Sequence, residues 1–194
     1  MSDKIYDLAS RERPTVHKAV ADSFAQIKDK PCWNAKQGHG SFLTFEFGEP
    51  SLVVNEYQRT SGKPGPDENP KVSRRTATVR GQWHLYIFCC HWKITFNDGT
   101  EAASDSSREE IEKALAKLSG QILSKATVAP RNGSSQFVFD LGGKLQTMPY
   151  EENTRSGEPH ENWMFFEAEN VLTYRADGKY AFHPPDKTSK EWFT

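Results

Sequence analysis

Ser41-Phe42-Leu43-Thr44-Phe45-Glu46-Phe47-Gly48 alternates apolar and polar residues and ends in a glycine. Such a pattern is typical of a half-buried β-strand that runs into a tight turn. It returns 94 positions later, in Ser135-Gln136-Phe137-Val138-Phe139-Asp140-Leu141-Gly142. A second block from Trp83 to Asn97-Asp98-Gly99 likewise has a counterpart from Trp163 to Asp177-Gly178. Self-similarity in a fixed order predicts one supersecondary unit that is used twice.

A helical pattern precedes each copy of the strand. The first follows Pro14, and the second opens with Ser107-Arg108-Glu109-Glu110, in which hydroxyl and carboxylate each satisfy an orphaned backbone N–H. Gly120 suits the left-handed conformation that often ends a helix. The apolar residues at helical spacing are Val16, Val20, Phe24 and Ile27, then Ile111, Ala114, Leu115 and Leu118.

These patterns predict an α+β fold of two similar units, each a helix followed by an antiparallel β-meander, packed as one compact body. The first predicted unit is residues 1–104, and the second is residues 105–194 with a C-terminal tail. Chance similarity between amphipathic strands is the alternative, because alternation and Asp-Gly turns are generic strand and hairpin signals.

The charge balance excludes some classes of partner. Lys and Arg number 25 against 26 Asp and Glu, so no bulk positive field gathers nucleic acid or an acidic membrane surface. No apolar run approaches the roughly 20 residues that cross a bilayer, and no apolar signal segment opens the chain. We expect a cytoplasmic protein that binds neither membrane nor nucleic acid, with its three cysteines as reduced thiols.

The stretch from Gln58 to Arg75 is almost devoid of apolar residues, which predicts a mobile loop. Its five basic residues against two acidic ones favour docking on an acidic partner, and a solvated surface loop is the alternative. Some of the abundant aromatic residues are expected to line a groove, although packing in the core would also explain them. The predicted partner-binding residues are Arg59, Lys63, Arg74, Arg75, Trp83 and Trp163.

Cys89-Cys90-His91 suggests a different function. In an extended segment Cys89 and His91 share one face, so with Cys32 they would begin a zinc site or a cysteine–histidine catalytic pair. No second pair at metal-ligand spacing follows, and buried thiols are the commoner case. A metal-dependent or cysteine-dependent enzyme that uses Cys32, Cys89 and His91 is therefore the alternative function, and no cofactor and no catalytic residue are predicted otherwise.

Six further runs stand out: Pro31-Cys32-Trp33-Asn34, residues 40–52, Val79-Arg80-Gly81-Gln82-Trp83-His84-Leu85, Cys89-Cys90, Phe139-Asp140-Leu141-Gly142-Gly143 and residues 171–178. Together they resemble an uncharacterised bacterial protein family. The order of helix, Phe-x-Phe strand and Trp-started hairpin is also similar to small immunity proteins of polymorphic toxin systems. This resemblance implies no catalytic residues. It favours a non-catalytic bacterial binding protein of the immunity type, whose partner is another protein and whose oligomeric state is not predicted.

Overall fold

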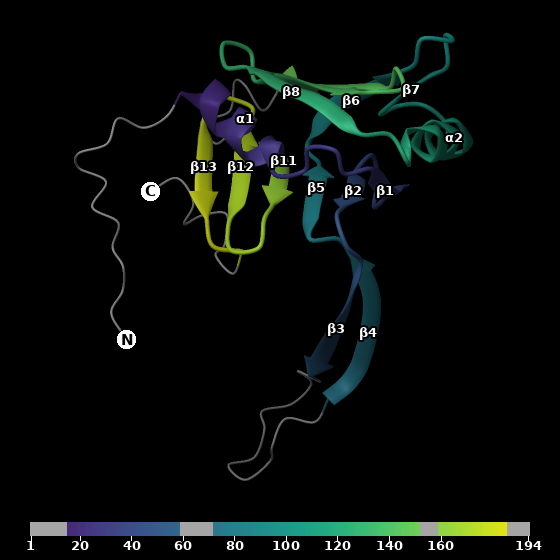
Figure 1. The fold of residues 1–194 in the computed structure, drawn as a ribbon, viewed down its shortest axis with the longest axis vertical. Helices are drawn as coiled ribbons and strands as arrows, with labels where there is room; N and C mark the ends of the chain where they lie inside the picture. The colour runs from purple at the N-terminus through teal and green to yellow at the C-terminus, as the bar shows by residue number, and fades with distance from the viewer. Residues whose placement is uncertain (1–14, 59–71, 152–158, 186–194) are drawn as a thin grey trace, which may run out of the picture.

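The computed structural model describes residues 15–58, 72–151 and 159–185, and every structural statement below concerns these residues. They form two helices, α1 (Val16–Ala25) and α2 (Arg108–Leu118), and thirteen strands. All the strand pairings are antiparallel, and they build two sheets and one separate two-stranded ribbon. Figure 1 shows the sheets stacked on each other, with the ribbon extending away from them. The predicted α+β class agrees with this architecture.

Each sheet combines strands from both sides of residue 104. The predicted division at residue 104 therefore does not assign one sheet to each unit. The predicted repeat of two equivalent units stays a prediction. The six-stranded sheet has the order β1 (Cys32–Gln37), β2 (Leu43–Phe47), β5 (Trp83–Ile87), β11 (Glu161–Phe166), β12 (Val171–Arg175), β13 (Tyr180–His183). The five-stranded sheet has the order β7 (Glu101–Ala103), β6 (Cys90–Thr95), β10 (Lys144–Pro149), β9 (Ser134–Phe139), β8 (Leu123–Ala129).

The core lies between the two sheets and is rich in aromatic side chains. Trp163 on β11 donates its indole N–H to Ser135 Oγ on β9 at 2.8 Å, which joins the sheets across the core. Phe24 from α1 stacks on Phe165 with ring centroids 4.4 Å apart, so the helix packs onto the same cluster. The largest fully buried side chains are Trp92, Trp163, Tyr174, Phe45, Phe47, Phe137, Phe139, Phe165, Ile27, Leu43, Leu85 and Ile87.

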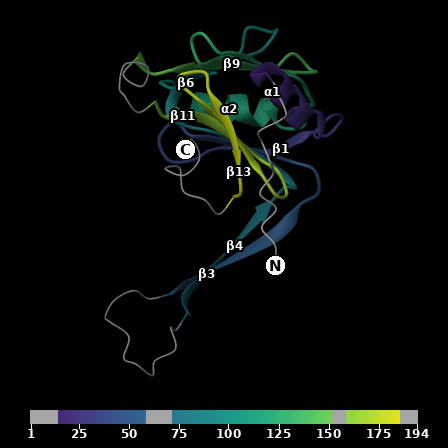
Figure 2. The same cartoon turned by 90° about the vertical axis from the view of Figure 1, so that its left-hand side faces the viewer.

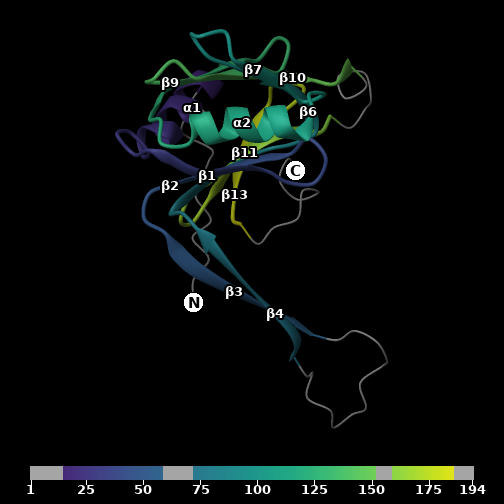
Figure 3. The same cartoon turned by 90° about the vertical axis from the view of Figure 1, so that its right-hand side faces the viewer.

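The predicted signals at the ends of α2 are confirmed. Ser107 Oγ accepts from the Glu110 backbone N–H while the Glu110 carboxylate accepts from the Ser107 backbone N–H. Gly120 follows with φ +94°, a left-handed conformation that glycine adopts without strain. Figure 3 shows α2 between the two sheets at one side, where it buries Ile111, Ala114, Leu115 and Leu118. Neither helix is long and apolar enough to span a membrane.

The ribbon consists of β3 (Ser51–Gln58) and β4 (Val72–Arg80). Figures 1 and 2 show it projecting away from the two sheets, and in Figure 1 it lies beyond the ends of β2 and β5. The sequence predicts that the strand ending at Gly48 turns tightly into the next strand of an antiparallel meander. Instead β2 pairs with β5, and β3 pairs only with β4. The predicted loop is also corrected, because Arg74 and Arg75 belong to a strand, and residues 59–71 lie outside the described residues.

Candidate functional site

The ribbon has one apolar face that nothing in the described structure covers. Directly opposite residues of an antiparallel pair place their side chains on the same side, and Leu52 opposes Val79 while Val54 opposes Ala77. We call these four residues the apolar ribbon face. Leu52 is 67% exposed and Val79 is 50% exposed. Four of the seven exposed large hydrophobic residues in the described structure, Leu52, Val53, Val54 and Val79, lie on this ribbon.

The apolar ribbon face ends in a polar pair toward the tip. Arg75 Nε donates to Glu56 Oε1 at 2.6 Å, an exposed ion pair that contributes little to stability. The opposite face is mostly polar, with the pairs Ser51–Arg80 and Asn55–Thr76. It also carries Val53, which lies opposite Thr78 and is 37% exposed.

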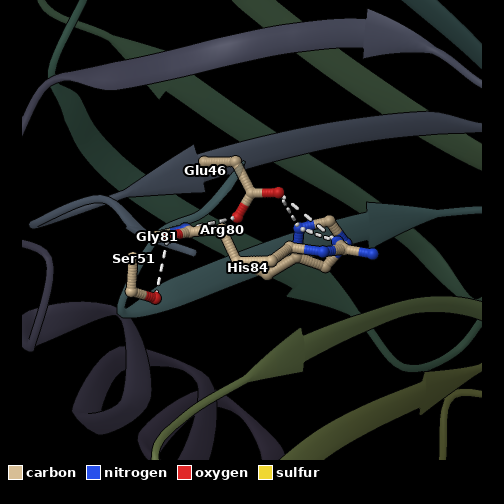
Figure 4. A network of polar contacts seen from close by, with 5 residues as sticks. All are labelled: Glu46, Ser51, Arg80, Gly81 and His84. Atoms are coloured by element: carbon tan, nitrogen blue, oxygen red, sulfur yellow. Dashed lines mark hydrogen bonds and ion pairs between the residues drawn. The ribbon is translucent and has the colours of Figure 1, made fainter. Parts of the chain in front are cut away.

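A buried carboxylate fastens the base of the ribbon to the six-stranded sheet. Glu46 on β2 is 1% exposed and accepts from the Gly81 backbone N–H at 3.0 Å and from Arg80 Nη1 at 3.4 Å. Its Oε1 also lies 2.9 Å from Nδ1 of His84 on β5. Figure 4 shows these four residues, which we call the clasp, with Ser51 Oγ donating to the Arg80 carbonyl beside them.

The clasp requires glycine at position 81. A Cβ atom there would stand 2.4 Å from the Phe47 carbonyl oxygen and 2.9 Å from its nitrogen, closer than real Cβ atoms approach backbone. The missing side chain lets the end of β4 come against β2, which brings Glu46 within reach of the Gly81 N–H.

The clasp keeps Glu46 ionised. Burial by itself raises the pKa of the Glu46 carboxyl, but the hydrogen bond and charge of His84, the hydrogen bond from Gly81 and the charge of Arg80 together outweigh it. The pKa therefore lies below its ordinary value. Because an ionised carboxylate only accepts hydrogen bonds, His84 Nδ1 must carry the proton between them.

Arg80 lies over the imidazole of His84 rather than at its edge. Its Nη1 is 3.2 Å from both Nδ1 and Nε2, which flank the same ring carbon. A nitrogen in the ring plane at both distances would collide with that carbon, so Nη1 lies over a face of the ring, where arginine often contacts aromatic rings.

A column of rings continues from His84 along β5. The His84 and Tyr86 rings lie 6.2 Å apart and tilted by 25°, and Tyr86 and Phe88 lie 4.9 Å apart and tilted by 14°. Phe42 meets the last two edge-on. His84 and Phe88 thus flank the Tyr86 ring on its two faces. A flat ligand could contact the edge of Tyr86 but could not stack on it.

A cleft of about 670 Å³ opens beside the clasp. It lies on the outer side of the six-stranded sheet, where Thr44 of β2, His84 and Tyr86 of β5, and Phe166 of β11 stand on neighbouring strands. The residues that line it are Gly38, Thr44, Arg80, Gly81, Gln82, His84, Tyr86, Phe166, Glu167 and Ala168. It combines charged, hydroxyl and aromatic groups.

The structure separates the predicted partner-binding residues. Arg59 and Lys63 lie outside the described residues, whereas Arg74 and Arg75 are exposed on β4. Trp83 is half-buried, with its indole N–H donated to Gln26 Oε1 at 3.1 Å. Trp163 is 0% exposed, so its predicted place on a binding surface is corrected: its ring is part of the core.

The structure does not bring Cys32, Cys89 and His91 together as a metal site. Cys32 points into the core, His91 is exposed against the ring of Tyr150, and no group of three His, Cys, Asp or Glu among the described residues is placed to hold a metal ion. Cys89 lies where the chain passes from β5 in one sheet to β6 in the other. Its φ of +51° is unusual for a residue with a side chain, and glycine or asparagine would adopt it more readily.

We expect the cysteines to be poor nucleophiles in the native protein. Burial raises the pKa of Cys32 to about 12, with the nearby Glu46 charge adding to it, and also raises the pKa of Cys90 and of Cys89. Iodoacetamide at about pH 8 should label Cys89 slowly and leave Cys32 and Cys90 unlabelled until guanidinium unfolds the chain. Peptide mass spectrometry measures this, and rapid native labelling of Cys32 would favour the alternative of a cysteine-dependent enzyme.

The sequence does not single out the clasp. Alternation along β2 places Glu46 on the polar face of the strand, which predicts that its side chain is exposed. In the structure, Arg80 and His84, which lie 34 and 38 positions later in the sequence, cover it. The only signal is that Glu46 and His84 lie opposite each other on paired strands. The register of that pairing cannot be read from the pattern of a single sequence.

Comparisons with protein-family models, curated proteins and solved structures give no match. The function is therefore inferred from the geometry of the ribbon, the clasp and the cleft.

Proposed function

We propose that this chain is a non-catalytic, cytoplasmic binding protein of the immunity type, which docks on another protein through the apolar ribbon face. The observation that carries the proposal is the exposure of Leu52, Val54, Ala77 and Val79 on a projecting ribbon. A two-stranded hairpin is marginally stable in water unless its apolar side packs on something. Docking would supply the missing layer, as in interfaces where strands carry the contact.

The clasp supports docking because it fixes the ribbon before a partner arrives. Glu46 joins the end of β4 to β2 and β5 through three contacts, so the base of the ribbon is held against the six-stranded sheet. A preorganised binding element loses less conformational entropy on association than one that must first be ordered.

Charge indicates the chemistry of the partner. By sequence, residues 51–80 hold six Lys and Arg against three Asp and Glu, while the rest of the chain holds 19 against 23. The ribbon segment is thus basic on an acidic protein, which favours a partner with an acidic surface around an apolar centre. Nucleic acid fits less well, because the uncovered face presents Leu and Val where phosphate contacts need Lys or Arg.

Photo-crosslinking tests the face dependence of this docking. Val79→p-benzoylphenylalanine places a reactive group on the apolar ribbon face, and Thr78→p-benzoylphenylalanine places it one residue away on the opposite face. In native host cells we expect one discrete adduct from position 79. Position 78 should give at most about a tenth as much adduct, because its side chain points away from the docked partner and lies outside the central contacts of the interface.

The adduct is identified by mass spectrometry. A partner with an acidic surface supports the proposal. Equal yields from both positions, no adduct, an adduct with nucleic acid, or an adduct with a second copy of the same chain would each contradict it.

A further inference from the structure

Two buried polar atoms at the cleft lack a hydrogen-bond partner among the described residues. They are Thr44 Oγ1 and Glu167 Oε1, and both residues line the cleft. Buried polar atoms in folded proteins are nearly always paired, so an orphan at a cleft is a site where water or a ligand group completes the hydrogen bonding. A carboxylate oxygen requires a donor, and a hydroxyl accepts readily.

His84 also lines the cleft. Its Nδ1 contacts Glu46 Oε1 at 2.9 Å, and Arg80 Nη1 lies 3.2 Å from both ring nitrogens. The imidazole is 13% exposed, so its ring forms part of the cleft wall.

One carboxylate, Glu167, and one guanidinium, Arg80, line the cleft among the described residues. The Nη1 of Arg80 contacts the Glu46 carboxylate behind the wall. The carboxylate of Glu167 has no cation in contact with its buried oxygen. The rings of Phe166 and Tyr86 form the apolar wall, and Phe166 meets His84 at a 60° angle with centroids 5.6 Å apart.

We infer that this cleft binds a small organic cation, an amine or a guanidinium compound. Two orphaned oxygens, Thr44 Oγ1 and Glu167 Oε1, favour a ligand with N–H groups. The carboxylate of Glu167 selects a positive charge, and the ring of Phe166 favours a cation over an anion. The cleft is separate from the apolar ribbon face, so this inference does not rest on the proposed docking function.

Titration with agmatine, which carries both an amine and a guanidinium, tests the inference on the full chain. Two-dimensional amide NMR should show saturable shifts at Thr44, His84 and Glu167 at concentrations up to roughly 10 mM, while succinate leaves them unmoved. Glu167→Gln should weaken agmatine binding at least about tenfold, because it removes the charge that pairs with the cation.

Glu169→Gln is the matched control. Glu169 is an exposed carboxylate in the same turn and does not line the cleft, so its loss should change the affinity less than about twofold. Val79→Lys on the ribbon should leave agmatine binding unchanged. No saturable shift, a preference for succinate, or equal weakening by Glu167→Gln and Glu169→Gln would each overturn the inference.

Discussion

Trp163→Ala is expected to destabilise the protein by about 3–5 kcal/mol, the range for removing a large aromatic side chain from a packed core. Trp163 is fully buried, stacks on Tyr174 with centroids 5.3 Å apart, and meets Phe24 and Phe137 edge-on. Its loss leaves a cavity between the two sheets and an unpaired Ser135 hydroxyl. Urea unfolding followed by far-ultraviolet circular dichroism measures the change in unfolding free energy.

Trp163→Phe keeps the measurement informative if the alanine variant does not fold. The smaller ring retains most of the packing and loses the hydrogen bond to Ser135, so we expect a loss of about 1–3 kcal/mol. A half-buried tryptophan, Trp83, gives the comparison, and Trp83→Ala should cost less than Trp163→Ala. A loss below about 1 kcal/mol for Trp163→Ala would contradict its place in the core.

Glu46→Gln is expected to destabilise the protein by about 1.5–3 kcal/mol and to loosen the base of the ribbon. The amide keeps one acceptor oxygen, but its NH₂ group must face either the Gly81 N–H, at the Oε2 position, or Arg80 and His84, at the Oε1 position, so at least one buried contact is lost. Arg80 is 46% exposed and can return to water, which keeps the cost below that of a fully buried broken ion pair. Urea unfolding gives the free energy, and hydrogen exchange at β3 and β4 reports the loosening.

The same carboxylate makes part of the stability depend on pH. The folded-state pKa of Glu46 lies below its ordinary value of 4.5, so its contribution is present above about pH 4.5 and is lost as the pH falls through the folded pKa. Glu46→Gln should therefore lose less stability than the wild type on acidification through that window. Glu49→Gln, at an exposed neighbouring carboxylate, should follow the wild-type curve, and identical curves for all three proteins would contradict the clasp.

Local patterns in the sequence predicted the elements that depend only on neighbouring residues. The capping box at Ser107 and the terminating Gly120 define α2, because each signal acts within one turn of helix. Alternation likewise predicted β2 and β9, whose alternate residues Phe45, Phe47, Phe137 and Phe139 are buried.

The arrangement of those elements depends on contacts between distant residues, which local patterns do not contain. Leu52-Val53-Val54 has the composition of a buried strand, yet its only partner is β4, so these side chains remain exposed. Trp163 and Trp83 carry the same local signal, but only Trp163 lies where two sheets face each other. Their different burial is decided by strand order, which interleaves the two halves of the chain.

Candidate site residues were missed for the same reason. Glu46 occupies a polar position on an amphipathic strand and would be solvated if β2 stood alone. Its burial requires β5 to pair beside it and the end of β4 to close over it, contacts set by register and by Gly81. The cleft then follows from the clasp, since Arg80 and His84 belong to both.

The dissociation constant of the purified partner, once crosslinking has identified it, tests docking by the apolar ribbon face most directly. Isothermal titration calorimetry should show Val79→Lys weakening binding at least about tenfold, because a lysine charge would be buried at the centre of the contact. Thr78→Lys, on the opposite face of the same strand, should leave the affinity within about twofold. Equal affinities for wild type and Val79→Lys would contradict docking by this face.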